Sequence, residues 1–540
     1  MNNLINQIRS TDYIEANSII KHASGIVDFF LSEDEKLDFI SSYDDSCQFV
    51  CEDKVSYGDW QTPVTLAKKI CEDHISKFGE PDVLIEPTCG LGAFIFSALE
   101  KFSNISEIHA LEINHQYVTE LKLNLLIHAL AAPSQHKKPD IYIYNADFFE
   151  FDFSPIINRC HDKNWNLAII GNPPWVTNSR QGKNNSNNIP LKENKYGLKG
   201  IDAITGKSNF DISEYITLNL LKLSHINKGG ISFLLKNSVI RNILTKQNIE
   251  QIHIGDIEQK LIDASSEFNV SVDASCFSAR FDCIPSFVCR IKDFYTNLFI
   301  REYGWINNSF VSDILLYKNF AKYDNSSSLV WRSGIKHDCT DILELTLADG
   351  VYINGLGEIV HIEDDLIYPL LKSSDINSYQ EGKFRKFIIV PQRKVADGTS
   401  ELKFTHPLAY SYLTKHEAAF ARRKSSIYKG KDKFSVFGIG EYSFKPYKIV
   451  VSSLYKRINF ILVSNIDGKP IMVDDTCYQL DFDNLEEAKS IYEALHSNEI
   501  ESLLKSLIFM DAKRVITKSL LMRLDLPLLC KDKGFSIISR

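Results

Sequence analysis

The chain has 540 residues, of which 44% are hydrophobic and 24% are charged, and its formal net charge is −8. This composition is typical of a globular protein with two or three domains. The chain contains no run of about 18 apolar residues, and Met1–Asn6 lack the pattern of a signal peptide, so we expect a cytoplasmic protein that spans no membrane. The 11 cysteines form no CxxC pair and predict reduced thiols without a metal site.

Residues 1–55 are acidic and predict an N-terminal helical segment, with Ser32-Glu33-Asp34-Glu35 as a helix start. From 56 to 295, predicted strands alternate with predicted helices. The strands are expected at 83–85, 108–111, 141–144, 167–170 and 231–235, the helices from Ala93, from Asn114 and over 210–223, and a turn at Gly229-Gly230. This alternation predicts an α/β fold with a doubly wound, mostly parallel sheet covered on both faces. Ligands of such sheets bind at the carboxyl ends of the strands.

One glycine-containing turn follows the first of these strands. Its sequence is Glu86-Pro87-Thr88-Cys89-Gly90-Leu91-Gly92, and a helix begins directly after it. Glycines let the backbone turn sharply and approach a ligand. The third glycine of a dinucleotide fingerprint is missing, because Ile95 occupies its place. The leading acid, Glu86, would repel a pyrophosphate and attract an ammonium group, so a cationic or zwitterionic ligand is expected.

Two further acids follow the next two strands. Glu112 lies 20 positions after Gly92 and can accept the hydroxyls of a ribose. Asp147 can accept a hydrogen bond from an adenine amino group while Phe148 covers the ring. Taken singly, Glu112 could be a helix N-terminal acid and Asp147 a turn residue. Three acids at three successive strand ends favour a ligand pocket.

A Pro-Pro turn, Asn172-Pro173-Pro174-Trp175, follows the strand predicted over 167–170. The prolines must end the strand. They leave a rigid turn with an amide side chain, a backbone carbonyl and an aromatic face. Such a turn can bind a planar amino group, because two oxygens accept its hydrogens while the ring stacks on its plane. The four residues alone also fit a strand-ending turn with a core tryptophan.

A polar segment over 180–209 follows this turn and contains five lysines. Loops of this length are usually functional or disordered. The sequence leaves both interpretations open: a clamp that closes on a substrate, or simple disorder.

Together these residues resemble the class I S-adenosylmethionine-dependent methyltransferases, specifically the DNA adenine amino-methyltransferases with the gamma-type motif order. Trp60-Gln61-Thr62-Pro63 resembles the upstream cofactor motif of that group, and the glycine turn and the Asn-Pro-Pro-Trp turn follow in order. The match covers about residues 56–295. It implies a catalytic domain at 56–295 and a mixed α+β DNA target-recognition domain at 296–540, after the N-terminal segment 1–55.

The resemblance also implies roles for individual residues. S-adenosyl-L-methionine would be bound by Thr62 at the methionine carboxylate, Glu86 near the amine, Thr88, Gly90 and Gly92 in the turn, Glu112 at the ribose, Asp147 and Phe148 at the adenine, and Asn172. The catalytic residues would be Asn172, Pro173, Pro174 and Trp175, with Phe268 as a second aromatic on the flipped base. A core phenylalanine is the alternative for Phe268. The implied reaction needs no metal.

The C-terminal part of the chain contains a strongly basic segment. Residues 371–460 hold 18 Lys and Arg against 7 Asp and Glu, a net charge of +11, so the remainder carries −8 − 11 = −19. Aromatic residues from Phe404 to Tyr447 interleave these charges. The segment predicts contact with the phosphates of duplex DNA, together with the loop at 180–209. A solvated lysine-rich face is the alternative. A polar stretch at 322–328 predicts a linker.

The expected function is therefore site-specific transfer of a methyl group to the exocyclic amino group of adenine in duplex DNA, with base flipping. Three other acceptors remain open: the cytosine amino group, an RNA base and a protein glutamine. The leading asparagine and the motif order favour adenine by resemblance only. A separately encoded restriction endonuclease is a possible partner.

Overall fold

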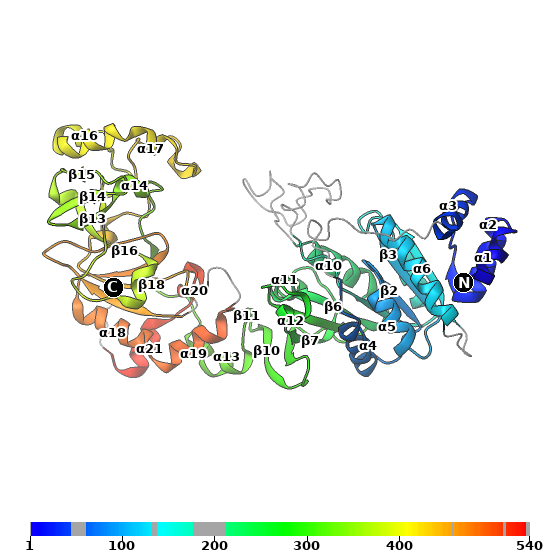
Figure 1. Cartoon of the computed structure of the whole chain (residues 1–540). Coiled ribbons are helices and arrows are strands. Elements are labelled where there is room, and N and C mark those ends of the chain that lie inside the picture. Colours follow the sequence, from blue (N-terminus) through cyan, green and yellow to red (C-terminus); the bar gives the residue numbers. More distant parts are fainter. Residues whose placement is uncertain are drawn as a thin grey trace. The chain divides into compact units, whose positions relative to one another are not determined.

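The structure is a computed structural model that describes residues 2–44, 61–131, 138–176, 211–455, 457–510 and 515–535. The chain forms two compact units, Met1–Phe310 and Val311–Arg540 (Figure 1). Trp60 and the predicted clamp at 180–209 lie outside the described residues. Among the helices that the structure describes, none combines the length and the apolar character needed to cross a bilayer.

An eleven-stranded sheet forms the centre of the first unit, in the order β1-β4-β3-β2-β5-β6-β8-β7-β9-β10-β11. Its strands are β1 (Ile26–Val27), β2 (Val83–Glu86), β3 (Glu107–Glu112), β4 (Asp140–Asn145), β5 (Asn166–Gly171), β6 (Lys228–Lys236), β7 (Gly255–Ile262), β8 (Ala274–Arg280), β9 (Val288–Asp293), β10 (Phe299–Ile306) and β11 (Ser309–Val311). The strands from β1 to β6 in this order are parallel to their neighbours. β8 is antiparallel to both β6 and β7. The predicted strands are all present, and the doubly wound, mostly parallel sheet is confirmed.

Two layers of helices cover this sheet. The helices of the unit are α1 (Asn2–Arg9), α2 (Tyr13–Ser24), α3 (Glu33–Asp44), α4 (Val64–Phe78), α5 (Ala93–Lys101), α6 (His115–Ala131), α7 (Ser154–Asp162), α10 (Ile212–Ser224), α11 (Asn237–Gln247) and α12 (Ala264–Phe268). α5 and α6 connect strands toward one edge of the sheet, whereas α7, α10 and α11 connect strands toward the other edge. Because such crossovers are right-handed, the two sets lie on opposite faces. In agreement, α5 packs on α4, and α10 packs on α7 and α11.

The N-terminal helices belong to the same unit. The predicted helix start at Ser32-Glu33 is confirmed by α3. Leu4, Ile5 and Ile8 of α1 are buried in the core that also contains residues of α4 and α5. β1 extends the sheet by pairing with β4. The stretch before 45 is therefore an integral part of the first unit.

Three boundaries differ from the sequence prediction. The units divide after Phe310, later than the predicted 295/296, because β10 and β11 continue the sheet. The linker predicted at 322–328 lies inside the second unit, where Asp324 hydrogen-bonds to Arg523. The turn predicted at Gly229-Gly230 is wrong, since both glycines lie within β6. Gly229 has a φ of +108°, and a Cβ there would lie 2.0 Å from the Leu167 carbonyl oxygen, so close strand contact requires this glycine.

Two sheets and surrounding helices form the second unit, which confirms the predicted mixed α+β architecture. One sheet has the order β12-β21-β18-β19, and the other has the order β15-β14-β13-β17-β16-β20. The strands are β12 (Arg332–Ser333), β13 (Glu344–Ala348), β14 (Val351–Asn354), β15 (Ile359–Val360), β16 (Ile367–Leu371), β17 (Lys386–Ile389), β18 (Tyr447–Ser452), β19 (Phe460–Ser464), β20 (Met472–Val473) and β21 (Cys477–Phe482). The helices are α13 (Ile314–Phe320), α14 (Thr340–Leu343), α15 (Leu402–Thr405), α16 (Pro407–Lys415), α17 (Glu417–Ala421), α18 (Leu485–Leu495), α19 (Asn498–Leu507), α20 (Lys518–Leu521) and α21 (Leu526–Lys533).

Candidate active site

The predicted site residues gather at one edge of the large sheet. Glu86 ends β2, Glu112 ends β3, Asp147 follows β4 and Asn172 follows β5. These strands are parallel and adjacent, in the order β4-β3-β2-β5. From β2 the chain continues through β3 and β4 on one side, and then returns to form β5 on the other side of β2. Open α/β sheets bind ligands where the strand order reverses in this way, here between β2 and β5. The four side chains therefore share the carboxyl edge of four neighbouring strands.

Glu112 holds the glycine turn in place. Its Oε2 accepts the Gly90 N–H at 2.9 Å, and its Oε1 accepts the Asn114 N–H at 2.8 Å. Gly90 and Gly92 have φ values of +51° and +82°, which favour glycine. The structure thus gives Glu112 a defined role in the turn. A carboxylate oxygen has two lone pairs, so this role leaves the predicted ribose contact possible.

Gln61 is a site residue that the sequence-based assignment of roles missed. Its Oε1 accepts the Leu91 N–H at 3.2 Å. A Cβ on Gly90 would lie 2.8 Å from Gln61 Nε2, so the Gln61 amide occupies the space that this glycine leaves. The only signal in the sequence was its position beside Thr62 in the upstream motif, because nothing local shows that residue 61 reaches the turn at 90–91.

Glu86 is almost completely buried, with 2% of its surface exposed. Burial, and then the charge of Glu112, raise the pKa of the Glu86 carboxyl well above its ordinary value. Within the described residues, Glu86 Oε2 and Thr88 Oγ1 are buried without a hydrogen-bond partner. Buried polar atoms are normally hydrogen-bonded, so this pair is a place where a ligand with donor groups fits. An ammonium group beside Glu86 would satisfy the carboxylate and favour its ionised form.

Asp147 and Phe148 form a turn after β4. Asp147 Oδ1 accepts the Phe149 N–H at 2.9 Å, which is the turn role that the sequence left open. Burial raises the pKa of Asp147. The Phe148 ring is 8% exposed and packs 5.5 Å from the Phe153 ring. The pair lies at the strand end that the cofactor prediction requires, and Phe148 is also part of the local packing.

Asn172 and Thr62 meet across the edge of the sheet. The Asn172 Nδ2 group donates to Thr62 Oγ1 at 3.2 Å, and both residues are half-buried. Thr62 lies just before α4, and Pro173 and Pro174 keep Asn172 clear of the strand ladder. The two predicted site residues are thus in direct contact.

Trp175 and Phe268 also meet. Their ring centroids are 5.3 Å apart with an interplanar angle of 67°, and each residue is 7% exposed. The Trp175 Nε1 group donates to the Leu234 carbonyl oxygen at 3.1 Å. Asp263 caps the short helix α12, which ends at Phe268. The structure pairs the two predicted aromatics, and both belong to the hydrophobic core, as the alternative interpretation expected.

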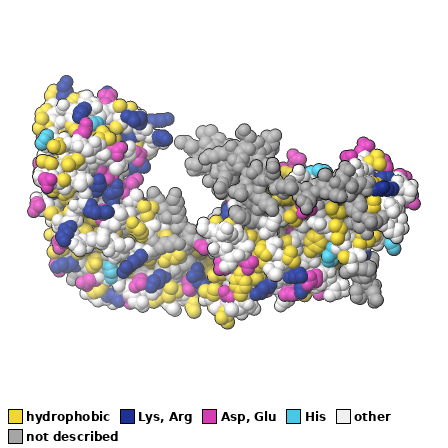
Figure 2. Space-filling model, in the orientation of Figure 1, with side chains coloured by type: hydrophobic (Ala, Val, Ile, Leu, Met, Phe, Trp, Pro, Cys, Tyr) yellow, Lys and Arg dark blue, Asp and Glu magenta, His cyan; other side chains and the backbone are white. Residues whose placement is uncertain are grey.

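The basic segment 371–460 divides into buried and exposed parts. Its aromatics Phe420 and Phe434 are buried, and Tyr410, Tyr412 and Phe444 pack against the same core. For these five aromatics the interleaving therefore reflects core packing and gives no support for nucleic-acid contact, whereas Phe404 is exposed. The exposed cations after α17 are Arg422, Lys424, Lys429, Lys431 and Lys433, of which Lys433 pairs with Glu417. Figure 2 shows Lys and Arg side chains projecting from the part of this unit that carries α16 and α17.

Arg423 differs from its basic neighbours because it is a structural residue. Its guanidinium donates to the carbonyl oxygens of Ser435 at 2.6 Å and Lys433 at 2.7 Å. It also lies over the Tyr428 ring, 3.8 Å from the ring centroid. Arg423 thus fastens the loop that carries the exposed cations.

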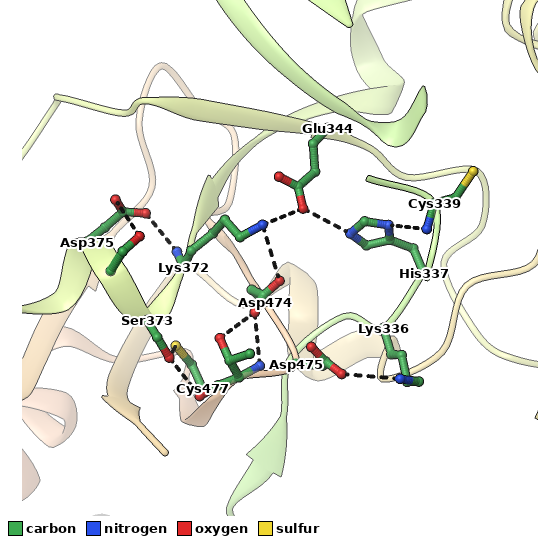
Figure 3. A network of polar contacts seen from close by, with 12 residues as sticks. Lys336, His337, Cys339, Glu344, Lys372, Ser373, Asp375, Asp474, Asp475 and Cys477 are labelled. Carbon is green, nitrogen blue, oxygen red and sulfur yellow. Dashed lines mark hydrogen bonds and ion pairs between the residues drawn. The ribbon is translucent and has the colours of Figure 1, made fainter. Parts of the chain in front are cut away.

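A buried polar cluster in the second unit contains His337, Glu344 and Asp474, whose ligand atoms lie within 4.8 Å of one another (Figure 3). The Lys372 Nζ group lies 2.5 Å from Glu344 Oε1 and 3.9 Å from Asp474 Oδ2. His337 Nδ1 accepts the Cys339 N–H at 3.2 Å, so Nε2 of a neutral ring carries the hydrogen and faces Glu344. A protonated nitrogen cannot bind a metal, and the Lys372 ammonium group already lies beside both acids. These contacts favour a structural ion-pair network over a metal site.

Comparison with known proteins identifies one close relative. The type II methyltransferase M.NspV of Nostoc sp. (strain ATCC 29411 / PCC 7524) is 39% identical over 480 residues, which cover 88% of this chain and 98% of the relative. No family model matches the sequence. The solved structure of the type IIL restriction-modification enzyme MmeI in complex with DNA has a TM-score of 0.49 and 11% identity, over 95% of this chain and 67% of that chain. The type IIG restriction endonuclease BpuSI has a TM-score of 0.35 and 14% identity, over 92% and 62%.

The family follows from the sequence identity to M.NspV over nearly the full length of both proteins. The fold follows from the strand order of the first unit, in which the parallel strands β1 to β6 are followed by a reversed strand, β8, that lies between β6 and β7. The chain belongs to the type II methyltransferases, and its first unit has the class I methyltransferase fold.

Proposed function

We propose that the protein transfers a methyl group from S-adenosyl-L-methionine to the exocyclic amino group of adenine at a specific site in duplex DNA. One observation carries the proposal: Asn172-Pro173, which can accept both hydrogens of an amino group, follows β5 directly beside the acids that end β2 and β3. An amino-group acceptor and a pocket suited to a cationic nucleoside thus share one edge of the sheet. A separately encoded endonuclease would be the expected partner within the restriction–modification system.

The chain's residues fit the cofactor through their chemistry. Glu86 and Thr88 offer buried oxygens, and Gly90 and Gly92 give the turn beside them the positive φ angles that it needs. Glu112 and Asp147 offer acceptors for hydroxyl and amino groups. When bound, S-adenosyl-L-methionine supplies an electrophilic methyl group on a sulfonium centre.

The Pro-Pro turn prepares the acceptor nitrogen. The Asn172 side-chain oxygen and the Pro173 carbonyl each accept one amino hydrogen, which draws the nitrogen lone pair out of conjugation with the ring. The reaction is a displacement that requires alignment, so positioning supplies much of the acceleration. The methylated amine loses its extra proton readily, and no strong base is required.

The target base must leave the duplex before it reaches this turn. Flipping costs roughly a few kcal/mol of lost pairing and stacking. Stacking on an aromatic side chain returns about 1–3 kcal/mol per base. Trp175 directly follows the acceptor residues, and this place in the chain supports it as the residue on which the base stacks. Its ring is 7% exposed and in contact with Phe268, so stacking requires that the ring is first uncovered.

The exposed cations after α17 provide a test of DNA binding. Replacing Arg422 and Lys424 with glutamine should weaken binding about tenfold, if each phosphate contact contributes about 0.7 kcal/mol. The slope of log K against log salt should fall by about 1.8, since each lost contact removes about 0.9. Fluorescence anisotropy of a labelled duplex over a range of salt concentrations measures both quantities.

Arg423 must stay intact in this test, because its hydrogen bonds hold the loop. The matched control replaces Lys489 and Lys505 with glutamine, which removes two charges from exposed positions on α18 and α19 of the same unit. That control should keep the wild-type slope. An equal change of slope in both variants would place the DNA contact elsewhere.

Glu86 provides a test of the cofactor pocket that does not depend on catalysis. The pKa of Glu86 is raised in the folded protein without cofactor. Glu86 therefore contributes to the free energy of unfolding below the ordinary carboxyl pKa of about 4.3, and this contribution is lost as the pH rises through the raised pKa. Glu86→Gln removes this loss, so the excess of its melting temperature over wild type should grow from pH 5 to pH 9. The same variant should bind S-adenosylhomocysteine about tenfold more weakly, because an ammonium group loses its carboxylate.

Thermal melts and calorimetric titrations check these two results. Glu150→Gln is the matched control, because Glu150 is exposed and lies in the neighbouring turn. It should change neither the pH trend nor the affinity. Wild-type affinity in Glu86→Gln would mean that Glu86 does not face the cofactor amine.

Nucleoside analysis of the product tests the proposed reaction. DNA, RNA and a glutamine-containing peptide are each incubated with the protein and isotope-labelled S-adenosyl-L-methionine, then digested and resolved by mass spectrometry. The proposal expects labelled N6-methyladenine from DNA. Labelled N4-methylcytosine, or label only in RNA or peptide, would contradict the proposal. The acceptor would then be cytosine, RNA or protein glutamine, each of which suits the same turn.

A further inference from the structure

One hydrogen bond connects the cofactor side of the site with the substrate side. It runs from Asn172 Nδ2 to Thr62 Oγ1 over 3.2 Å and joins residues that are 110 positions apart in the sequence. Thr62 lies before α4, and Asn172 follows β5. The two residues belong to different segments of the chain, so the bond joins two separately placed parts of the site.

The segment that carries Thr62 is fixed from its other side. Gln61 Oε1 accepts the Leu91 N–H, and the Gln61 amide fills the space beside Gly90. Adjacent residues of one extended segment thus contact the glycine turn and the Pro-Pro turn. The segment is a bridge between the two halves of the site.

The orientation of the Asn172 amide decides what it can bind. One end of an amide accepts hydrogen bonds and the other end only donates them. With Nδ2 directed at Thr62, Oδ1 points away from it, which is the orientation that accepts an amino group. The flipped amide would present its own NH₂ to the substrate NH₂, and two donors facing each other oppose binding.

A threonine hydroxyl has one proton and two lone pairs. It can accept from Asn172 Nδ2 while it donates its proton to an anion on its other side. Without such an anion, the hydroxyl can rotate and donate to the oxygen of a flipped amide, which removes the preference for the accepting orientation. The state of the hydroxyl proton and the orientation of the amide are therefore coupled.

We infer that Thr62 is a positioning residue that couples occupancy of the cofactor pocket to the orientation of Asn172. Its hydroxyl donates to the carboxylate of the methionine moiety and accepts from Asn172 Nδ2, so a filled pocket favours the amide orientation that accepts the substrate amine. The inference rests on the proposed function in two respects, namely that Asn172 binds the acceptor amino group and that Thr62 faces the methionine carboxylate.

A simpler role for Thr62, as a ligand of the cofactor carboxylate alone, makes a different prediction. In that case Thr62→Val would raise the KM for S-adenosyl-L-methionine, and a saturating concentration would restore kcat. The coupling role predicts that kcat stays at least about tenfold below wild type at saturation, because a misoriented amide no longer stabilises the transition state. Thr62→Ser keeps the hydroxyl and should restore the wild-type kcat.

The second measurement is a binding experiment without turnover. The dissociation constant of the substrate duplex is measured by anisotropy with and without S-adenosylhomocysteine, which retains the carboxylate. Wild type and Thr62→Ser should bind the duplex at least about fivefold more tightly with the ligand. Thr62→Val and Thr62→Ala should lose this difference while still binding each ligand alone. The control Thr245→Val, which removes a hydroxyl bonded to the Arg241 carbonyl of its own helix, should behave as wild type.

The results separate this inference from the proposed function. A wild-type kcat in Thr62→Val at saturating cofactor, or an unchanged ligand effect on duplex affinity, would overturn the role of Thr62. Absence of the ligand effect in wild type would do the same. Should the wild-type protein methylate RNA or a glutamine peptide and not DNA, the proposed function is wrong, and the same two measurements with that acceptor still decide the role of Thr62.

Discussion

Asn172→Ala should lower the rate of methyl transfer about 10³-fold while the protein still binds S-adenosylhomocysteine with nearly wild-type affinity. The substitution removes the side-chain oxygen that accepts one hydrogen of the substrate amine. Loss of one preorganised hydrogen-bonding group in an active site costs about 10²–10³ in kcat. The loss here should be at the upper end, because the same contact also aligns the nitrogen. Single-turnover transfer of labelled methyl groups and calorimetric titration measure the two effects.

Asn242→Ala is the matched control for this variant. Asn242 lies on α11 and donates to Glu214 Oε2 at 2.9 Å, so the change removes an asparagine hydrogen bond in the same unit but away from the Pro-Pro turn. It should keep the wild-type kcat. Near-normal transfer by Asn172→Ala would show that the Pro-Pro turn is an architectural feature, as the tetrapeptide alone allows.

Lys372→Met should destabilise the second unit by about 3–5 kcal/mol, the cost of breaking a buried ion pair from one side. Lys372 is 30% exposed, but its partners Glu344 and Asp474 are only 3% and 9% exposed (Figure 3). Without the ammonium group, two buried carboxylates would be left without their cation. Denaturant unfolding followed at a probe in the second unit measures the change.

The pH dependence of this loss follows from Glu344. Burial opposes its ionisation, but hydrogen bonds from His337 and Lys372 outweigh burial and lower the pKa of Glu344. A lowered pKa gives stability that is present above the ordinary carboxyl pKa of about 4.3 and is lost as the pH falls through the lowered value. The deficit of Lys372→Met should therefore be largest near neutral pH and shrink toward acid.

Two further variants isolate the buried network. Glu344→Gln added to Lys372→Met should recover part of the loss, because it removes one of the stranded charges. Lys415→Met breaks an exposed pair with Glu358 and should cost less than about 1 kcal/mol. Equal costs for Lys415→Met and Lys372→Met would mean that the cluster in Figure 3 is no more than a surface ion pair in energetic terms.

The catalytic edge could be predicted from sequence because its signals are local. Buried apolar runs are followed by Glu86, Glu112, Asp147 and Asn172, and parallel strands place their carboxyl ends at the same edge. That reasoning needs only strand identity and direction. It correctly brought together residues that span almost ninety positions of the chain (86 to 172).

Contacts between distant segments could not be predicted in the same way. Gln61 fills the space beside Gly90, and Trp175 donates to the Leu234 carbonyl, but no periodicity links those positions. The sequence predicts a turn at Gly229-Gly230, because a glycine required by close strand packing cannot be distinguished in sequence from one required by a turn. Charge counting also could not separate Arg423, which fastens a loop, from its exposed neighbour Arg422.

The predicted domain boundaries were wrong for a related reason. The alternation of predicted strands and helices stops near 295, which indicates the end of the first domain, yet β10 pairs with β9 and extends the sheet. Antiparallel edge strands lack the helix–strand alternation that marks the rest of the unit. The polar stretch at 322–328 resembled a linker because the partner of Asp324, Arg523, lies 199 residues away.

Methylation-sensitive sequencing of DNA from cells that express the wild-type protein, beside cells that express Asn172→Ala, tests the central claim most directly. The account predicts N6-methyladenine at one defined sequence in the first culture and unmodified DNA in the second. Modified cytosine at that sequence, unmodified DNA in both cultures, or equal N6-methyladenine in both would contradict it.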